Sequence, residues 1–213
     1  MFADAQGLAR VAWQLEGTGR DEIEPVALHR TPVLELSGVP VEIPPGVFLQ
    51  ASAEAEKVLS ALVVEASQGS RVADLYCGVG TFALPLAAAG AKVMAVDGDS
   101  AAIAALARAA GTAGFGGQVM AAQRDLVRQP MAAAEFRRIE TIVFDPPRAG
   151  AAAQAEEIAQ TDAARVVAVS CNPMTFARDA LTLTEGGYTL ERITPVDQFV
   201  WSGHVELVAV FSR

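Results

Sequence analysis

The chain has 213 residues, of which 52% are hydrophobic and 19% are charged, a balance that excludes intrinsic disorder and suits one domain with a real core plus a small appendage. No apolar run is long enough to span a membrane, the N-terminus lacks a secretion signal, and two cysteines are too few for a disulfide framework or a four-cysteine metal site. We therefore expect a cytoplasmic protein with reduced thiols and no metal cluster, and the net charge of −9 argues against tight RNA binding by this chain alone.

The first part of the chain is expected to be β-rich. Residues 8–16 alternate, residues 17–22 form a turn, and short strand pieces broken by Gly and Pro continue to residue 46. We predict a small β-rich appendage over residues 1–46 and a second domain over residues 47–213. A helix over residues 51–66 opens the second domain, with Ser52 as its N-cap.

Strands and helices alternate regularly after residue 71. Strands are predicted at 71–76, 92–97, 118–125, 141–145, 165–170, 188–199 and 204–213, and helices at 80–90, 100–114, 152–162 and 174–187, with a polar helix that ends at 138. This order predicts an α/β fold with a doubly wound, mostly parallel, seven-stranded, Rossmann-like sheet. The last two strands have no helix between them, so we expect an antiparallel hairpin at or near one edge.

Residues 74–81, DLYCGVGT, join the first strand of the sheet to its helix. The segment holds only GxG, without the third glycine of a dinucleotide cradle or the GK[ST] of a P-loop. An acid at the first strand end and a second acid after the next strand fit S-adenosylmethionine, whose sulfonium is cationic and whose ribose diol suits a carboxylate. The predicted cofactor contacts here are Asp74, Gly78, Gly80, Thr81 and Asp97.

Alternatives stay open for several of these residues. Asp74 is otherwise a turn residue, and Asp97 is otherwise the cap of the following helix. Asp125, which follows the third strand, contacts the adenine or is a solvated loop acid. We expect Cys77 to be a packed thiol.

The second half of the chain carries the chemical signals. Residues 165–173, RVVAVSCNP, are typical of a buried parallel strand that ends in a polar turn, where ligands bind in α/β sheets. Cys171 is therefore a nucleophile or a reduced structural cysteine. Asp145 ends the preceding strand, and the two prolines after it stiffen the loop. Enzymes that methylate exocyclic amines place an aromatic residue after a similar loop, and Arg148 in that position argues against that reaction.

The motifs DLYCGVGTF, DPPR and VSCNP, followed by D-x-F and HVE, resemble the RNA 5-methyluridine methyltransferase family over roughly residues 47–213. Members of that family have the class I methyltransferase fold and methylate carbon-5 of uridine in tRNA or ribosomal RNA. The resemblance implies that Cys171 is the covalent nucleophile and Glu206 the base. It also implies that Gln50, Tyr76, Asp97 and Asp145 touch the cofactor or the site, supported by Arg148, Asn172, Pro173 and His204.

The chemistry explains these residue types. Carbon-5 of uracil is a poor nucleophile until a thiolate adds to carbon-6, and the proton left on carbon-5 afterwards requires a base. We expect Arg148 or backbone N–H groups to favour the thiolate of Cys171. Alternation in HVELVAVF does not decide whether Glu206 faces the site or solvent.

The sequence also departs from the family pattern. Ser52 replaces the usual Asn and Asp97 the usual Glu, while the loss of a proline and the presence of Gly203 are expected to loosen the loop before the base. Trp201 either stacks on a nucleobase or belongs to the core. The oligonucleotide-binding barrel and the iron–sulfur cysteines of full members are expected to be missing, which predicts a catalytic half that binds RNA weakly without an additional domain.

The sequence thus predicts an S-adenosylmethionine-dependent RNA uracil-C5 methyltransferase. A cofactor-binding remnant that recruits RNA or a partner is one alternative. RNA cytosine-C5 methylation is another, ranked lower because such enzymes place a cysteine after Pro-Pro, where this chain has Arg148.

Overall fold

The computed structural model describes residues 2–15, 23–199, 201–202 and 204–213. A seven-stranded sheet has the order β10-β11-β9-β8-β5-β6-β7. Its strands are β5 (Arg71–Leu75), β6 (Lys92–Asp97), β7 (Val119–Gln123), β8 (Thr141–Phe144), β9 (Arg165–Ser170), β10 (Thr189–Val196) and β11 (Glu206–Ser212). All adjacent pairs are parallel except those of β11, which runs antiparallel to β10 and β9. The predicted doubly wound sheet and its antiparallel hairpin near one edge are confirmed.

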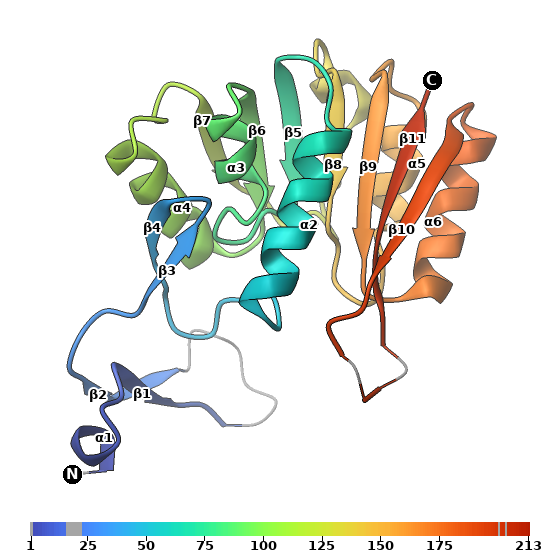
Figure 1. Ribbon diagram of the computed structural model, residues 1–213. Helices are drawn as coiled ribbons and strands as arrows, with labels where there is room; N and C mark the ends of the chain where they lie inside the picture. The colour runs from blue at the N-terminus through green and yellow to red at the C-terminus, as the bar shows by residue number, and fades with distance from the viewer. Residues whose placement is uncertain (1, 16–22, 200, 203) are drawn as a thin grey trace.

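Helices cover both faces of this sheet (Figure 1). One face packs against α2 (Ala53–Ala66), α3 (Ala83–Ala88) and α4 (Ser100–Thr112), and the other against α5 (Ala152–Ala159), α6 (Pro173–Glu185) and the short 3-10 helix η2 (Ala133–Phe136). Side chains of each strand alternate between the two layers: Val72, Val143 and Val167 lie in the first core, and Ala73, Ile142 and Val166 in the second. Burial on both faces explains why these strands read as continuous apolar runs.

Local sequence sets the helix boundaries. The Ser52 hydroxyl accepts the backbone N–H of Ala55 at 3.1 Å, so the predicted N-cap of α2 is confirmed. The polar helix expected to end at residue 138 is wrong: the described structure there has only η2. Pro130 lacks an N–H and breaks that stretch, and Arg124 fills the resulting turn by donating to the carbonyl oxygens of Gln129 and Pro130.

The N-terminal part is β-rich, as predicted. After the short helix α1 (Phe2–Ala5) come two hairpins, β1 (Arg10–Trp13) with β2 (Glu24–Leu28) and β3 (Val33–Leu36) with β4 (Val39–Glu42). The first hairpin projects away from the sheet, whereas the second lies beside α4 (Figure 1). Side chains of β3 and β4, including Leu36 and Val41, belong to the same core as α2 and α4.

The expected turn at 17–22 lies outside the described residues, and the domain boundary at residue 46 stays a prediction. Within the described part of the chain, no helix is long and apolar enough to cross a membrane.

Candidate active site

Three predicted site residues meet at one edge of the sheet. Asp145 directly follows β8, Cys171 directly follows β9, and Glu206 is the first residue of β11. Leu207 pairs with Ser170 in the antiparallel β9–β11 ladder, so the next step of the same register sets Glu206 opposite Cys171. Glu206 is only 4% exposed, which places it inside the protein rather than on an outward strand face.

A tight turn presents Cys171 at the end of β9. The Ser170 hydroxyl accepts the backbone N–H of Asn172 at 3.2 Å. The Asn172 side chain caps α6 by accepting the N–H of Met174 at 3.1 Å, and its Nδ2 donates to the carbonyl oxygen of Arg148 at 3.1 Å. Asn172 therefore ties the cysteine turn to the DPPR loop, while Pro173 occupies the first turn of the helix, where a missing N–H costs nothing.

Burial raises the pKa of all three ionisable groups of this cluster, and neighbouring acids add to the shift of Asp145 and Cys171. Burial raises the pKa of Asp145 to about 7, the charge of Glu206 adds to the shift, and a hydrogen bond from Gln50 opposes it. Burial also raises the pKa of Glu206. The pKa of Cys171 is raised by burial, then by Glu206 and Asp145, and these effects outweigh the lowering by its own backbone and by Arg148. The expected preference for the thiolate is therefore not met in the chain by itself.

Asp74 is the most unusual polar group of the fold. It is 0% exposed, and among the described residues neither of its carboxylate oxygens has a partner within hydrogen-bond geometry. Burial raises its pKa well above the usual value, the charges of Asp145 and Asp97 add to the shift, and the nearby backbone N–H of Ala83, which lies outside hydrogen-bond geometry, offsets only part of it. A buried acceptor without a donor is costly, so Asp74 suits a ligand that brings positive charge or N–H groups to it.

The two glycines of the β5–α3 loop have different surroundings. Gly78 has φ +53° and nothing within 4 Å of where a Cβ would stand, so it leaves open space beside the backbone. Gly80 has φ +101°, and a Cβ there would lie 2.5 Å from Leu106 of α4. Asp97, at the end of β6, accepts the Gly78 N–H at 2.9 Å and anchors the loop.

Other predicted site residues have local partners. Asp125 Oδ1 accepts the backbone N–H groups of Val127 and Arg128 at 3.0 and 3.1 Å. His204 is exposed, with its ring 6.1 Å from that of Phe199 in an edge-on arrangement. The Thr81 carbonyl accepts the Ser60 hydroxyl at 3.1 Å, and Tyr76, in the loop with φ +61°, has its pKa raised to about 12 by burial, then by Asp179, Asp125 and Asp97.

The remaining predictions for this region have mixed outcomes. Trp201 is 98% exposed, which excludes the core alternative. Gly203 lies outside the described residues. Cys77 is 3% exposed within the core, and burial raises its thiol pKa well above the usual value, in agreement with a packed thiol.

Sequence reasoning missed Gln198. It lies between β10 and β11, and its Nε2 donates to Glu206 Oε1 at 3.1 Å and to Gln50 Oε1 at 3.3 Å. Gln50 Nε2 in turn donates to Asp145 Oδ2 at 3.3 Å. A single amide in an irregular segment has no periodic signal, so only the tertiary arrangement assigns it to the site.

The residues at the β5 and β6 ends fit S-adenosylmethionine. The unpartnered carboxylate of Asp74 offers acceptors to cationic and N–H groups, and the open side of Gly78 leaves room beside the loop. The acid Asp97 stands one strand away, where a ribose diol would need it. When bound, this cofactor supplies an electrophilic methyl group. Among the described residues, no group of three or more His, Cys, Asp or Glu side chains is placed to hold a metal ion.

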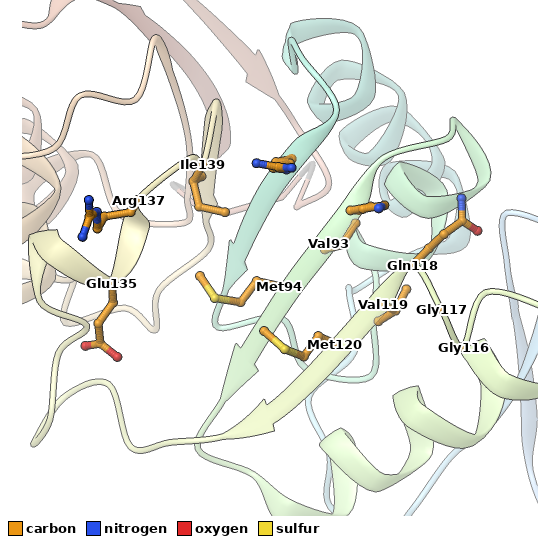
Figure 2. A pocket seen from close by; sticks show the side chains of 12 residues that line it. Val93, Met94, Gly116, Gly117, Gln118, Val119, Met120, Glu135, Arg137 and Ile139 are labelled. Carbon is orange, nitrogen blue, oxygen red and sulfur yellow. The ribbon is translucent and has the colours of Figure 1, made fainter.

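A separate groove of about 320 Å³ opens at the opposite end of the sheet, where β5, β6 and β7 begin (Figure 2). Met94 and Met120 lie next to one another on its floor, and Arg137 and Glu135 approach from the other side. Glu135 is already paired with Arg124 at 2.8 Å. No thiol or hydroxyl lines this groove among its described residues.

Comparisons with known proteins agree with this geometry. The chain is 52% identical over 185 residues to an uncharacterized RNA methyltransferase of Caulobacter vibrioides, a match that covers 86% of this chain and 44% of that protein. It is 36% identical to the 23S rRNA (uracil(1939)-C(5))-methyltransferase RlmD of Aeromonas hydrophila, covering 91% of this chain and 44% of that protein. The chain spans about half the length of the curated relatives it matches.

A solved structure supports the same assignment. The tRNA (uracil-54, C5)-methyltransferase of Pyrococcus abyssi in complex with S-adenosyl-L-homocysteine superposes with a TM-score of 0.81 at 27% identity, over 96% of this chain and 51% of that one. The fold is thus that of class I S-adenosylmethionine-dependent methyltransferases, as predicted. The family model described as tRNA (uracil-5-)-methyltransferase matches residues 41–213. The chain therefore belongs to the tRNA (uracil-5-)-methyltransferase family.

Proposed function

We propose that this chain transfers a methyl group from S-adenosylmethionine to carbon-5 of a uridine in tRNA or ribosomal RNA through a covalent adduct on Cys171. The observation that carries the proposal is the meeting of Cys171, Glu206 and Asp145, which lie at the ends of three different strands on one side of the sheet. The family and the named relatives support the same substrate atom.

In the proposed reaction, Cys171 is the nucleophile and Glu206 is the base. Cys171 loses its thiol proton to solvent water, and the resulting thiolate sulfur bonds to carbon-6 of uracil while the ring's C5–C6 π electrons move into an enolate. S-adenosylmethionine, held beside Asp74, Gly78 and Asp97, would supply the methyl group to carbon-5, and S-adenosylhomocysteine would be the leaving group. Glu206 then takes the proton from carbon-5, the C5–C6 double bond re-forms, and the carbon–sulfur bond breaks to return the thiolate.

The electrostatics of the site suit this order of events. The raised pKa of Glu206 makes it a stronger base than an exposed glutamate. The two acids raise the pKa of the Cys171 thiol, so neutralising their charge favours the thiolate. A cationic methyl donor near Asp145 and Asp74 would couple cofactor binding to activation of the nucleophile.

The net charge bears on the RNA partner. With −9 overall, the chain by itself is expected to bind RNA weakly and to need an additional RNA-binding domain. An electrophoretic mobility assay checks this point, since micromolar binding that persists at 200 mM salt would contradict it. We also propose that the reaction takes place in the cytoplasm, where both thiols would stay reduced.

The test uses RNA that carries 5-fluorouridine, because fluorine on carbon-5 cannot be removed as a proton and the adduct is trapped. We expect a covalent protein–RNA band that needs the cofactor, disappears in Cys171→Ser and persists in the matched control Cys77→Ala. Glu206→Gln, on ordinary RNA, should form the adduct but release it slowly. Cofactor binding without any adduct would instead support a cofactor-binding remnant, and an adduct only with 5-fluorocytidine RNA would support cytosine methylation.

A further inference from the structure

Two amides connect the two acids of the site. Gln198 Nε2 donates to Glu206 Oε1 at 3.1 Å and to Gln50 Oε1 at 3.3 Å, and Gln50 Nε2 donates to Asp145 Oδ2 at 3.3 Å. The four residues come from the segment before α2, the end of β8, the segment after β10 and the start of β11. Three hydrogen bonds therefore form one unbroken path between the carboxylates.

The direction of the donors favours the ionised form of each acid, although burial still leaves both pKa values raised. Each amide gives an N–H to the carboxylate beside it, and a carboxyl that carried its proton on the same oxygen would meet that N–H with an O–H. The bond from Gln198 lowers the pKa of Glu206 against the effect of burial, and the bond from Gln50 does the same for Asp145. Each amide thereby favours the form of the neighbouring acid that accepts its hydrogen bond.

The other ionisable groups coupled to this cluster are Cys171, which follows β9, Arg148, from the loop after β8, and Asp74 of β5, whose pKa is raised by the charge of Asp145. The charges of Glu206 and Asp145 raise the pKa of the thiol, and Arg148 lowers it. None of these groups supplies Glu206 with an N–H in hydrogen-bond geometry within the described residues, whereas Gln198 does. The orientation of the glutamate thus depends on that amide.

We propose that Gln198 is a positioning residue for proton removal from carbon-5, which holds the Glu206 carboxylate in the orientation of a base and links it to the Gln50–Asp145 pair. The proposal rests on the proposed function of the site. Gln198 touches neither reacting atom in this role and acts through Glu206.

A purely structural role makes a different prediction. The Gln198 carbonyl oxygen Oε1 is buried and has no hydrogen-bond partner among the described residues. Replacement by an apolar side chain of similar size removes this unsatisfied acceptor, but it also leaves the buried Glu206 Oε1 and the Gln50 Oε1 without their donor, so Gln198→Leu should lower the urea midpoint of unfolding below that of the control. A purely structural loss of this kind would slow methyl transfer and proton removal alike, whereas a positioning role predicts that Gln198→Leu slows proton removal alone.

The kinetic test separates methyl transfer from proton removal. Single-turnover reactions use RNA tritiated at uridine carbon-5 and cofactor with a labelled methyl group, with Gln160→Leu as control because the Gln160 amide is exposed and bonds only locally, to the Glu156 carbonyl. In Gln198→Leu we expect methyl incorporation close to wild type and tritium release about tenfold slower at pH 7, the order contributed by one charge-assisted hydrogen bond. The defect should shrink at higher pH, and Gln198→Glu should be slower still. Unchanged tritium release, or an equal loss in both steps, would overturn the proposal.

A second measurement needs no substrate. Carbon-detected NMR follows the titration of the Glu206 carboxyl in the free protein, with its signal assigned by its loss in Glu206→Gln. Gln198→Leu should move the midpoint to higher pH, since a donor to the ionised form is lost. An unmoved midpoint contradicts the placement of Gln198. A moved midpoint in a protein that methylates no RNA would remove the proposed function alone and leave this contact standing.

Discussion

The ionisation of Asp145 gives a stability prediction that is independent of any substrate. Burial and the neighbouring Glu206 raise its pKa from 3.8 to about 7, so the folded protein holds a proton that the unfolded chain releases. This contribution to stability is complete below pH 3.8 and is lost as the pH rises to about 7. A shift of about three units corresponds to roughly 4 kcal/mol. Asp145→Asn cannot ionise and should not pay this cost, while its side-chain oxygen still accepts from Gln50.

We therefore expect Asp145→Asn to be more stable than wild type by about 1.5 kcal/mol at pH 5 and by roughly 4 kcal/mol above pH 8. Urea unfolding at both pH values, followed by circular dichroism, measures the difference. Asp162→Asn is the control for an Asp-to-Asn change, since Asp162 is exposed and precedes β9, at the opposite end of the sheet from the site. A gain in unfolding free energy for Asp145→Asn that is equal at both pH values would refute the reasoning that burial destabilises the ionised carboxylate.

Two further predictions concern the nucleophile and the glycine loop. Arg148→Leu removes a charge that lowers the pKa of Cys171, so the pH dependence of the rate of Cys171 alkylation by iodoacetamide should shift to higher pH. The measurement is made in a Cys77→Ala background, where Cys171 is the remaining thiol, and an unshifted pH profile would contradict the role of Arg148. Gly80→Ala brings a Cβ to 2.5 Å from Leu106 at φ +101° and should destabilise the fold by about 2 kcal/mol or more, measured by urea unfolding. In Gly78→Ala the new Cβ meets no atom within 4 Å, so the variant should lose only about 1–2 kcal/mol of stability, from its backbone conformation. Its affinity for S-adenosylmethionine, measured by calorimetry, should nevertheless be weaker. Equal effects on stability and binding in both glycine variants would contradict this prediction.

The sequence alone determined the sheet and the positions of its strand ends. Runs such as residues 166–169 are apolar throughout because helices cover both faces, and the polar turns that follow mark the carboxyl ends of parallel strands. These are local signals, so they also located Asp74, Asp145 and Cys171. The polar helix predicted up to residue 138 was wrong because Pro130 and the turn held by Arg124 override a weak helical pattern.

Only the tertiary structure decided how the site is arranged. Alternation in the last strand does not reveal which way Glu206 faces, and the antiparallel register with β9 sets it opposite Cys171. Gln50 and Gln198 are far apart in sequence and join the acids by contacts that no local pattern encodes. The unfavourable shift of the Cys171 pKa likewise comes from burial and from charges on two other strands. Local propensity fixes which elements form, whereas pKa values and hydrogen-bond paths depend on distances across the assembled sheet edge.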